Sequence, residues 1–220
     1  MSGRFIRDPY ITHVALWLQE QGKSLIPDRA EAEAFLHRLD PDSGGYSFRT
    51  FSDSGYTRNA THDPLEKALH GTLNQCWDEL VALNQAGAVI TVTINRTNGI
   101  GRDKDDITRI QAVFVDDDRG LDPLELTIAP HLVVNTSPGH FHYYWRVASL
   151  PLSRFSEVQQ RLAERYSGDR RVQALNQSMQ VPGFWRRKQV TQPRLPRLVE
   201  IHDSPPLDAG AIDRLLGDEV

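Results

Sequence analysis

Three consecutive aspartates, Asp116, Asp117 and Asp118, follow an apolar run in the stretch QAVFVDDDRG (residues 111–120). On a β-strand, side chains two residues apart lie on the same face, so Asp116 and Asp118 are expected to project together. Two carboxylates that close repel each other unless a cation lies between them. Mg²⁺ and Mn²⁺ prefer oxygen ligands and commonly bind one or two carboxylates together with substrate phosphates. The spacing indicates a divalent-metal site, with a charged strand end that runs into a turn as the alternative.

A second polar group lies on the stretch TSPGHFHYYW (residues 136–145). His140 and His142 are two residues apart on a predicted strand and therefore share a face. Ser137 and Gly139 stand in a predicted tight turn, whose backbone N–H groups can bind phosphate oxygens together with a hydroxyl and an imidazole. The pattern indicates a phosphate site, with a surface histidine and core aromatic residues as the alternative interpretation.

Positive charge is concentrated in the last third of the chain. Residues 154–197 hold ten arginines and lysines against three acids, whereas the whole chain has a net charge of −4. The turn PGFWRRK (residues 182–188) places aromatic side chains next to three cations, which suits stacking on bases and pairing with phosphates. An acidic site beside a basic surface suits a metal-dependent enzyme that acts on a polyanion. Solvated helix faces are the simpler alternative.

The composition excludes several classes of protein. With 220 residues, 39% hydrophobic and 25% charged, the chain can bury a core without crosslinks. Cys76 is the single cysteine, which excludes an intramolecular disulfide and a zinc site built from several cysteines. No apolar run reaches the roughly 18 residues of a membrane span, and the N-terminus lacks the apolar region of a signal peptide, so we expect a cytoplasmic protein without membrane contact.

The elements that must position these residues follow from periodicity and turn residues. Helices are expected over residues 10–22, 28–38, 63–87, 153–166 and 169–179 and near the C-terminus, and strands over 45–53, 88–95, 109–117, 130–137, 141–147 and 197–203. Asp63 as N-cap, Pro64 at the first position and Gly87 as the stop support the 63–87 helix. Connections between the strands from 109 to 147 are too short for helical crossovers, which predicts antiparallel neighbours.

Together these elements predict an α+β fold, with a mainly antiparallel sheet flanked by helices. We expect one domain over residues 1–205, followed by a C-terminal helix or the start of a linker over residues 206–220.

The order and spacing of the motifs resemble the archaeo-eukaryotic primase superfamily, in particular the primase–polymerase domains of phages and plasmids. The resemblance covers roughly residues 45–190. It includes the D-x-D of Asp116 and Asp118, the S-x-G-x-x-H that ends at His142, and the V-P-G-F-x-x-R-K turn that ends at Lys188. It implies an RRM-like catalytic sheet beside a smaller N-terminal α/β part.

The resemblance also implies a reaction and its site: primer synthesis or extension from NTP or dNTP with Mg²⁺ or Mn²⁺, during replication of a mobile element. Asp116 and Asp118 match the metal-binding acids and, with His142, the catalytic residues. The nucleotide-binding residues would be Ser137, Gly139, His142, Arg187, Lys188 and Arg102. The single-stranded DNA template is expected on the basic surface, at Arg154, Arg161, Arg165, Arg170, Arg171 and Arg186. A replicative helicase, separate or fused after residue 220, is a further expected partner.

One departure from the family pattern leaves alternatives open. The family has a third acid about nine residues before the P-G glycine, where this chain has Ala174; the nearest acid is Asp169, five residues further away. A missing carboxylate would weaken metal binding and predicts a weak polymerase, with Asp169 as a candidate substitute, or a module that binds DNA and nucleotide without extending. The His-x-His of His140 and His142 also matches rolling-circle nucleases, for which Tyr166 would have to be the nucleophile.

Overall fold

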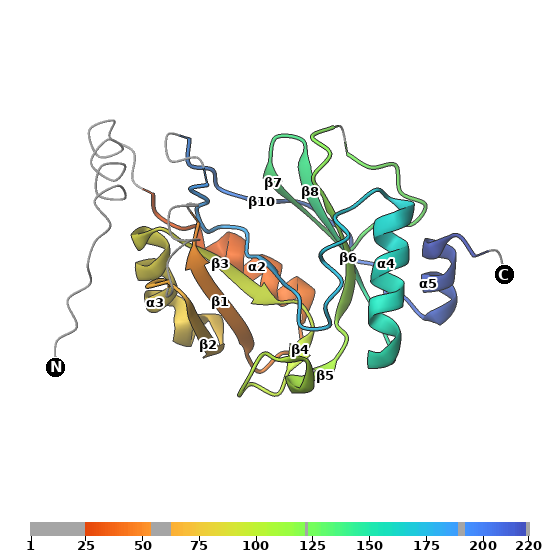
Figure 1. Cartoon of the computed structure of the whole chain (residues 1–220), viewed down its shortest axis with the longest axis horizontal. Helices are drawn as coiled ribbons and strands as arrows, with labels where there is room; N and C mark the ends of the chain where they lie inside the picture. Colours follow the sequence, from red (N-terminus) through yellow and green to blue (C-terminus); the bar gives the residue numbers. More distant parts are fainter. Residues whose placement is uncertain (1–24, 54–62, 122, 189–191, 219–220) are drawn as a thin grey trace.

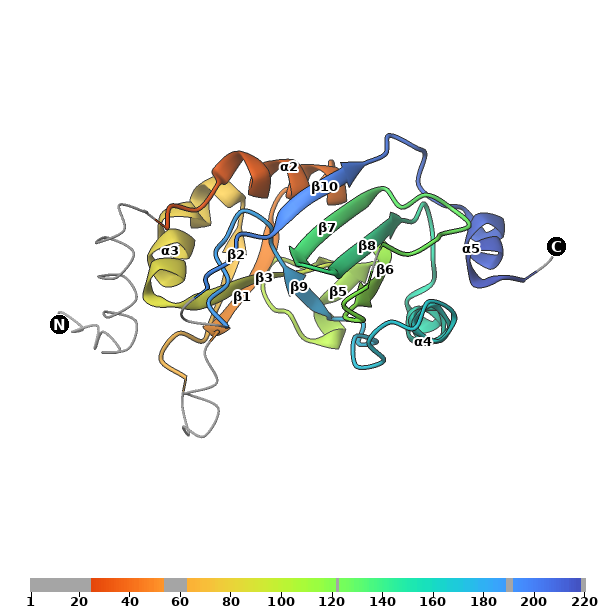
Figure 2. The same cartoon turned by 90° about the horizontal axis from the view of Figure 1, so that it is seen from above.

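The computed structural model describes residues 25–53, 63–121, 123–188 and 192–218, so the helix expected over residues 10–22 lies outside the described residues. Two four-stranded sheets lie next to each other along the long axis of the molecule (Figure 1). Helices α2 and α3 lie on one side, and α4 lies on the other (Figure 2). Every strand ladder is antiparallel, which confirms the α+β fold with mainly antiparallel sheets.

The first sheet has the strand order β2-β1-β3-β9. Its strands are β1 (Tyr46–Ser52), β2 (Lys67–Gly71), β3 (Ala88–Thr93) and β9 (Ser178–Gln180). Phe48, Val92 and Met179 stand opposite one another in register and are buried, so they line the apolar face. Helix α3 (Leu73–Ala86) packs against β2 and β3. Helix α2 (Arg29–Leu39) lies on the same side and reaches the second sheet, where its Phe35 ring meets Tyr144 edge-on.

The second sheet has the strand order β10-β7-β8-β6. Its strands are β6 (Ala112–Asp117), β7 (Leu132–Ser137), β8 (His140–Arg146) and β10 (Arg197–Ile201). The predicted antiparallel pairing is confirmed for β7 and β8. The expected pairing of the first two strands is wrong, because β6 pairs with β8 and lies across it from β7. Helix α4 (Phe155–Arg165) packs on β6, and α5 (Ala209–Leu216), the expected terminal helix, packs on α4. A small ladder of β4 (Arg96–Thr97) and β5 (Ile107–Arg109) precedes β6.

The helix predicted over residues 63–87 is wrong in its first third. Residues 67–71 form β2, paired with β1, because the pairing with a distant strand outweighs the local helical pattern. Helix α3 begins only after Thr72, whose hydroxyl accepts from the Gln75 N–H at 3.2 Å while the Gln75 side chain accepts from the Thr72 N–H at 2.8 Å. The predicted end is confirmed, with Gly87 in the left-handed conformation at φ 107°.

The helix predicted over residues 169–179 is wrong as well. This segment is a series of turns that ends in β9, and it carries Asp169 away from α4 toward the end of β6. The strand predicted over residues 109–117 is divided between the end of β5 and β6. None of the helices in the described ranges is long and apolar enough to cross a membrane.

Candidate metal and nucleotide site

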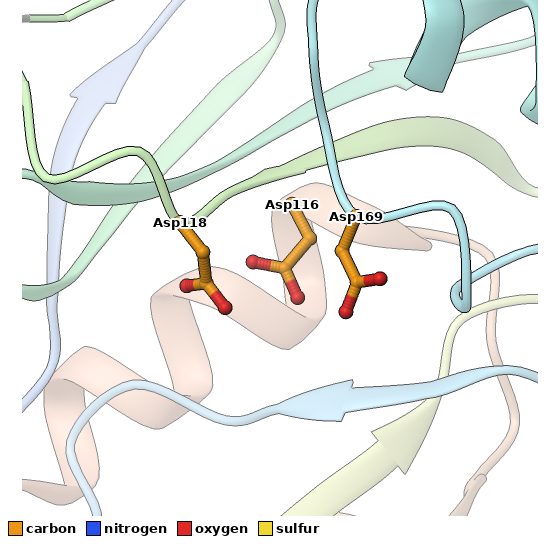
Figure 3. Close-up of side chains that lie close together, drawn as sticks. All are labelled: Asp116, Asp118 and Asp169. Carbon is orange, nitrogen blue, oxygen red and sulfur yellow. The ribbon is translucent and has the colours of Figure 1, made fainter.

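Three carboxylates meet at the end of strand β6 and point to the same side (Figure 3). Asp116 belongs to β6, Asp118 follows it, and Asp169 comes from the loop after α4. One oxygen from each carboxylate lies within 4.8 Å of an oxygen of each of the others. The Asp118 side chain is 59% exposed, so an ion in solvent can reach the group. A cation offsets the repulsion between such charges, and an all-oxygen donor set fits Mg²⁺ or Mn²⁺.

The loop after α4 brings Asp169 to Asp116 by backbone contacts. Ser167 adopts φ 54°, and the Gly168 N–H donates to the Ala163 carbonyl at 2.9 Å, which closes the helix. The Asp169 N–H then donates to the Asp116 carbonyl at 2.9 Å. The position expected for the third acid, Ala174, lies five residues further along, in a turn closed by its own carbonyl. A third carboxylate therefore lies beside Asp116 and Asp118, and it belongs to Asp169, the candidate substitute that the sequence offered.

Gly168 permits this close approach. A Cβ at residue 168 would lie 2.9 Å from the Val115 Cγ1 and 3.2 Å from the Asp116 carbonyl oxygen. We expect Gly168→Ala to lower the free energy of unfolding by about 1–3 kcal/mol and to weaken Mn²⁺ binding, because the loop must move away from β6. Thermal unfolding and Mn²⁺ titration measure both effects. Gly44→Ala is the matched control, since no atom lies within 4 Å of its added Cβ; equal metal affinity in both variants would contradict this role.

Asp169 is held ionised by its neighbour Arg171. Hydrogen bonds from the Arg171 side chain, at 3.0 Å to each carboxylate oxygen, lower the pKa of Asp169 below its usual value, and the Arg171 N–H donates at 2.9 Å. The Arg171 side chain is 86% exposed and also lies in the field of Asp116 and Asp118. Arg171, expected to bind template, thus lies at the acid cluster.

His142 stands directly opposite Asp116 in the β6–β8 ladder. Its Nε2 lies 3.4 Å from Asp116 Oδ1, and its Nδ1 lies 3.1 Å from the hydroxyl of Tyr144. Nε2 faces the Asp116 carboxylate, and the Tyr144 hydroxyl donates to Nδ1 or accepts from it according to the tautomer of the ring. Burial raises the pKa of Tyr144 well above its usual value, which keeps the hydroxyl neutral. Asp116 and His142 are brought together as predicted, with Tyr144 as a partner that the sequence did not reveal.

We expect Tyr144→Phe to reduce nucleotide incorporation roughly tenfold without unfolding the protein, because His142 loses the hydroxyl group that holds its imidazole ring in place. Tyr143→Phe is the control. It also removes a hydroxyl, which accepts from the Leu124 N–H at 2.9 Å, but residue 143 lies on the opposite face of the strand. Primer extension and thermal unfolding of both variants test this prediction; equal losses of incorporation in the two would refute a positioning role for Tyr144.

His140 and the following turn complete the edge of the site. The Nδ1 of His140 lies 3.0 Å from Asp118 Oδ1. Gly139 adopts φ 73°, and a Cβ there would lie 2.6 Å from the backbone of Gly120, so the β7–β8 turn packs directly on the turn after the aspartates. Ser137, at the end of β7, is partly exposed beside this turn. The predicted shared face of His140 and His142 is confirmed by their contacts with Asp118 and Asp116.

Asp117 points the opposite way, as the alternation predicts. Its side chain is fully buried and accepts from Arg119 Nε at 2.7 Å, from Arg119 Nη2 at 3.0 Å and from the Arg119 N–H at 3.2 Å. The middle aspartate therefore anchors the turn that follows β6 and is not part of the acid cluster.

The three cations of the 182–188 turn have different surroundings. Arg186 donates to the buried carboxylate of Asp53 at 3.0 Å. Arg187 is buried, and its guanidinium donates to the Gln85 carbonyl at the end of α3 at 2.9 Å, which favours a structural role. Lys188 is exposed. Nucleotide contacts by Arg187 and Lys188 stay predictions.

Arg154, just before α4, and two arginines of α4 lie against the C-terminal segment that contains α5. Arg154 lies 3.8 Å from Asp213, and Arg161 lies 2.6 Å from Asp218. The Arg165 guanidinium lies over the Tyr166 ring and against Gly217. These ion pairs reduce the positive surface that the sequence predicts, whereas Arg170 is exposed.

The nuclease alternative requires Tyr166 to act as a nucleophile on DNA, but the Tyr166 side chain is buried. Its hydroxyl bonds the Thr127 hydroxyl at 3.1 Å and the Leu215 carbonyl at 3.3 Å, and its ring stacks on Trp145. This environment disfavours attack on a DNA strand.

Comparisons with known proteins identify a family for this chain. Residues 88–202, just over half of the chain, match the RepB DNA-primase N-terminal domain family. No curated protein matches the sequence.

Solved structures share the fold at low sequence identity. The primase–polymerase domain of cyanophage S-2L, of the archaeo-eukaryotic primase type, is 17% identical with a TM-score of 0.65, covering 87% of this chain and 99% of that one. Primase RepB′ is 18% identical with a TM-score of 0.61, covering 86% of this chain and 61% of that one. The catalytic domain of RepB′ in complex with initiator DNA is 16% identical with a TM-score of 0.55, covering 96% and 94%. The chain belongs to the RepB DNA-primase N-terminal domain family.

Proposed function

We propose that this domain catalyses template-directed nucleotidyl transfer that depends on a divalent metal, and so starts or extends a primer during replication of a mobile element. The observation that carries the proposal is the cluster of Asp116, Asp118 and Asp169 beside His142 at one sheet edge. Phosphoryl transfer needs little covalent chemistry from the protein, so positioned carboxylates and phosphate donors are the main requirement.

Each part of the site has a role in this reaction. Asp116, Asp118 and Asp169 would hold Mg²⁺ or Mn²⁺. A divalent ion in such a site neutralises phosphate charge and makes a 3′-hydroxyl a better nucleophile. His142 and the turn of Ser137 and Gly139 would bind phosphate oxygens of an NTP or dNTP. Arg102 and Lys188 would add positive charge as the negative leaving group departs.

The template proposal rests on exposed cations near the acids. Arg170 and Arg171 are exposed in the loop that carries Asp169. The catalytic domain of RepB′ is described in complex with initiator DNA, which supports DNA as a partner here. Arg154, Arg161, Arg165 and Arg186 already have acidic or aromatic partners, so we expect them to contribute less. A replicative helicase remains a proposed partner.

Incubation with a single-stranded template, labelled ATP or dATP, and Mn²⁺ or Mg²⁺ tests the proposal. We expect labelled products longer than one nucleotide that depend on both template and metal, and none with EDTA. Template binding without any incorporation, in either metal and with either nucleotide, would refute the catalytic function and leave a DNA-binding initiation module.

A further inference from the structure

A pocket lies at the end of the second sheet that is far from the acid cluster. It has a volume of about 210 Å³ and is lined by the last turn of α2, the start of β7 and the ends of β8 and β10. In Figure 2, α2 and β10 lie side by side along this edge of the molecule. On β8, Arg146 at the pocket is four residues beyond His142, which corresponds to about 13 Å along a strand. Tyr144, between them, is buried against Phe35, so this distal pocket is separate from the metal site.

Positively charged and imidazole side chains surround the distal pocket. Arg38 and His37 come from the last turn of α2, Arg146 ends β8, and His202 follows β10. A basic last turn also offsets the negative end of the helix dipole, which accounts for Arg38 but not for Arg146 on the sheet. Two arginines from different elements therefore line one small pocket, an arrangement suited to phosphate or carboxylate groups.

Asp203 is the one carboxylate among the described residues that line the pocket. It pairs with Arg38, and the side chains of Asp203 and Arg38 are 76% and 41% exposed. Water screens an ion pair this exposed, so the pair adds little to stability. Arg146 donates to the Ser204 carbonyl at 3.3 Å, and a guanidinium has five N–H donors, so others remain for a ligand. An anion with more oxygens than a carboxylate can therefore replace Asp203 on Arg38 and bind Arg146 as well.

His131 forms the buried floor of the pocket and argues against a metal ion there. Its Nδ1 accepts from the Arg146 N–H at 3.1 Å, and its Nε2 lies 3.1 Å from the Pro205 carbonyl, to which it donates. Burial lowers the pKa of His131, in agreement with a neutral ring. Both ring nitrogens are thus occupied, and among the described residues the histidines of this pocket form no cluster with metal-ligand spacing.

The size of the pocket favours a single phosphate group. Pockets for drug-sized ligands measure about 300–1,000 Å³, and one water molecule takes about 30 Å³ of the liquid. The distal pocket is smaller than the first range, so it has room for a phosphate group but does not enclose a whole nucleotide. Leu132 and Ile201, opposite each other on β7 and β10, form an apolar wall that leaves the polar contacts to the arginines.

We propose that the distal pocket is a second anion site, in which Arg38 and Arg146 bind one phosphate group that displaces Asp203. His37 and His202 are exposed beside it and would add N–H donors. The phosphate group belongs either to a free phosphate ion or to the backbone of a nucleic acid strand that passes this edge of the domain. The site does not depend on the proposed polymerase activity, because none of its residues belongs to the acid cluster.

Titration with inorganic phosphate tests the proposal. Metal-free protein is used, so that no ion at the acid cluster binds the phosphate, and the amide signals of Ile201 and His202 are followed by NMR. We expect both signals to shift and saturate in the wild type. Arg38→Gln and Arg146→Gln should each weaken this binding about tenfold, because a charged hydrogen bond is lost. Asp203→Asn should tighten it about twofold or more, because the competing carboxylate is gone.

Arg29→Gln is the matched control. It makes the same change of charge on α2, but Arg29 lies in the first turn and donates to Asn74 at 2.8 Å, outside the pocket. Its phosphate affinity should equal that of the wild type. Thermal unfolding establishes that each variant is folded. If Arg146→Gln does not fold, because it also loses the bond to Ser204, Arg38→Gln and Asp203→Asn still decide.

A second titration identifies the source of the phosphate group. A thymidine oligonucleotide without terminal phosphates offers only backbone phosphodiesters. Shifts of Ile201 and His202 that weaken in Arg38→Gln support the site with either ligand, and the ligand that binds more tightly is the source. Absence of shifts with both ligands, or equal affinities of Arg38→Gln and the wild type, would overturn the proposal.

Discussion

The double variant Asp116→Asn/Asp118→Asn is expected to lose nucleotide incorporation by at least about a thousandfold, which corresponds to about 4 kcal/mol of transition-state stabilisation. Two of the three clustered carboxylates disappear, and Asp169 alone cannot offset the charge of a divalent ion. The substitution keeps the size of both side chains. It also removes repulsion between like charges, so we expect the melting temperature to stay the same or to rise.

The control for this variant carries the same change of charge elsewhere. Asp42 and Asp78 are exposed and lie outside the acid cluster, so Asp42→Asn/Asp78→Asn should extend primers at the wild-type rate. Rates of both double variants are compared over a range of Mn²⁺ concentrations. Extension by Asp116→Asn/Asp118→Asn at the wild-type rate would show that the chemistry occurs elsewhere.

The second large effect is expected at Asp169. Asp169→Asn should reduce incorporation by about a hundredfold and shift the Mn²⁺ requirement upward, because one of three charged oxygen ligands becomes neutral. Adding a carboxylate at the position expected from the family spacing, as Asp169→Asn/Ala174→Asp, should not restore activity. The Ala174 carbonyl closes a turn with the Gln177 N–H at 2.9 Å, and residue 174 lies outside the acid cluster.

Mn²⁺ binding followed by electron paramagnetic resonance separates metal affinity from catalysis in these variants. We expect weaker binding in Asp169→Asn and no recovery in the variant with the added acid. If Ala174→Asp restored both Mn²⁺ affinity and incorporation, the site would be built on residue 174 and the role of Asp169 would be wrong.

The placement of the side chains was predicted correctly where local geometry decides it. Alternation along one strand placed Asp116 and Asp118 together and turned Asp117 into the protein, where it pairs with Arg119. The same rule placed His140 and His142 on one face, and each contacts one of the acids. The same alternation places Tyr144 on the face of His142. The sequence did not reveal that the Tyr144 side chain is fully buried, which raises the pKa of its hydroxyl.

Prediction failed where a segment pairs with a distant part of the chain. Residues 67–71 have a helical pattern of leucines but form a strand, since β1 offers them an edge with five paired positions. Residues 169–177 have the composition of a helix but form turns, because Asn95, Arg102 and Asp116 bond their backbone or side chains. Local propensity cannot reveal such partners.

The sequence by itself determined the antiparallel character of the sheets and which acids and which histidines share a face, because a strand's twofold alternation and its short connections are properties of neighbouring residues. Only the tertiary structure decided the third carboxylate. Asp169 is 53 residues from Asp116 in the chain, and it joins the cluster through one backbone hydrogen bond and the absence of a side chain at Gly168.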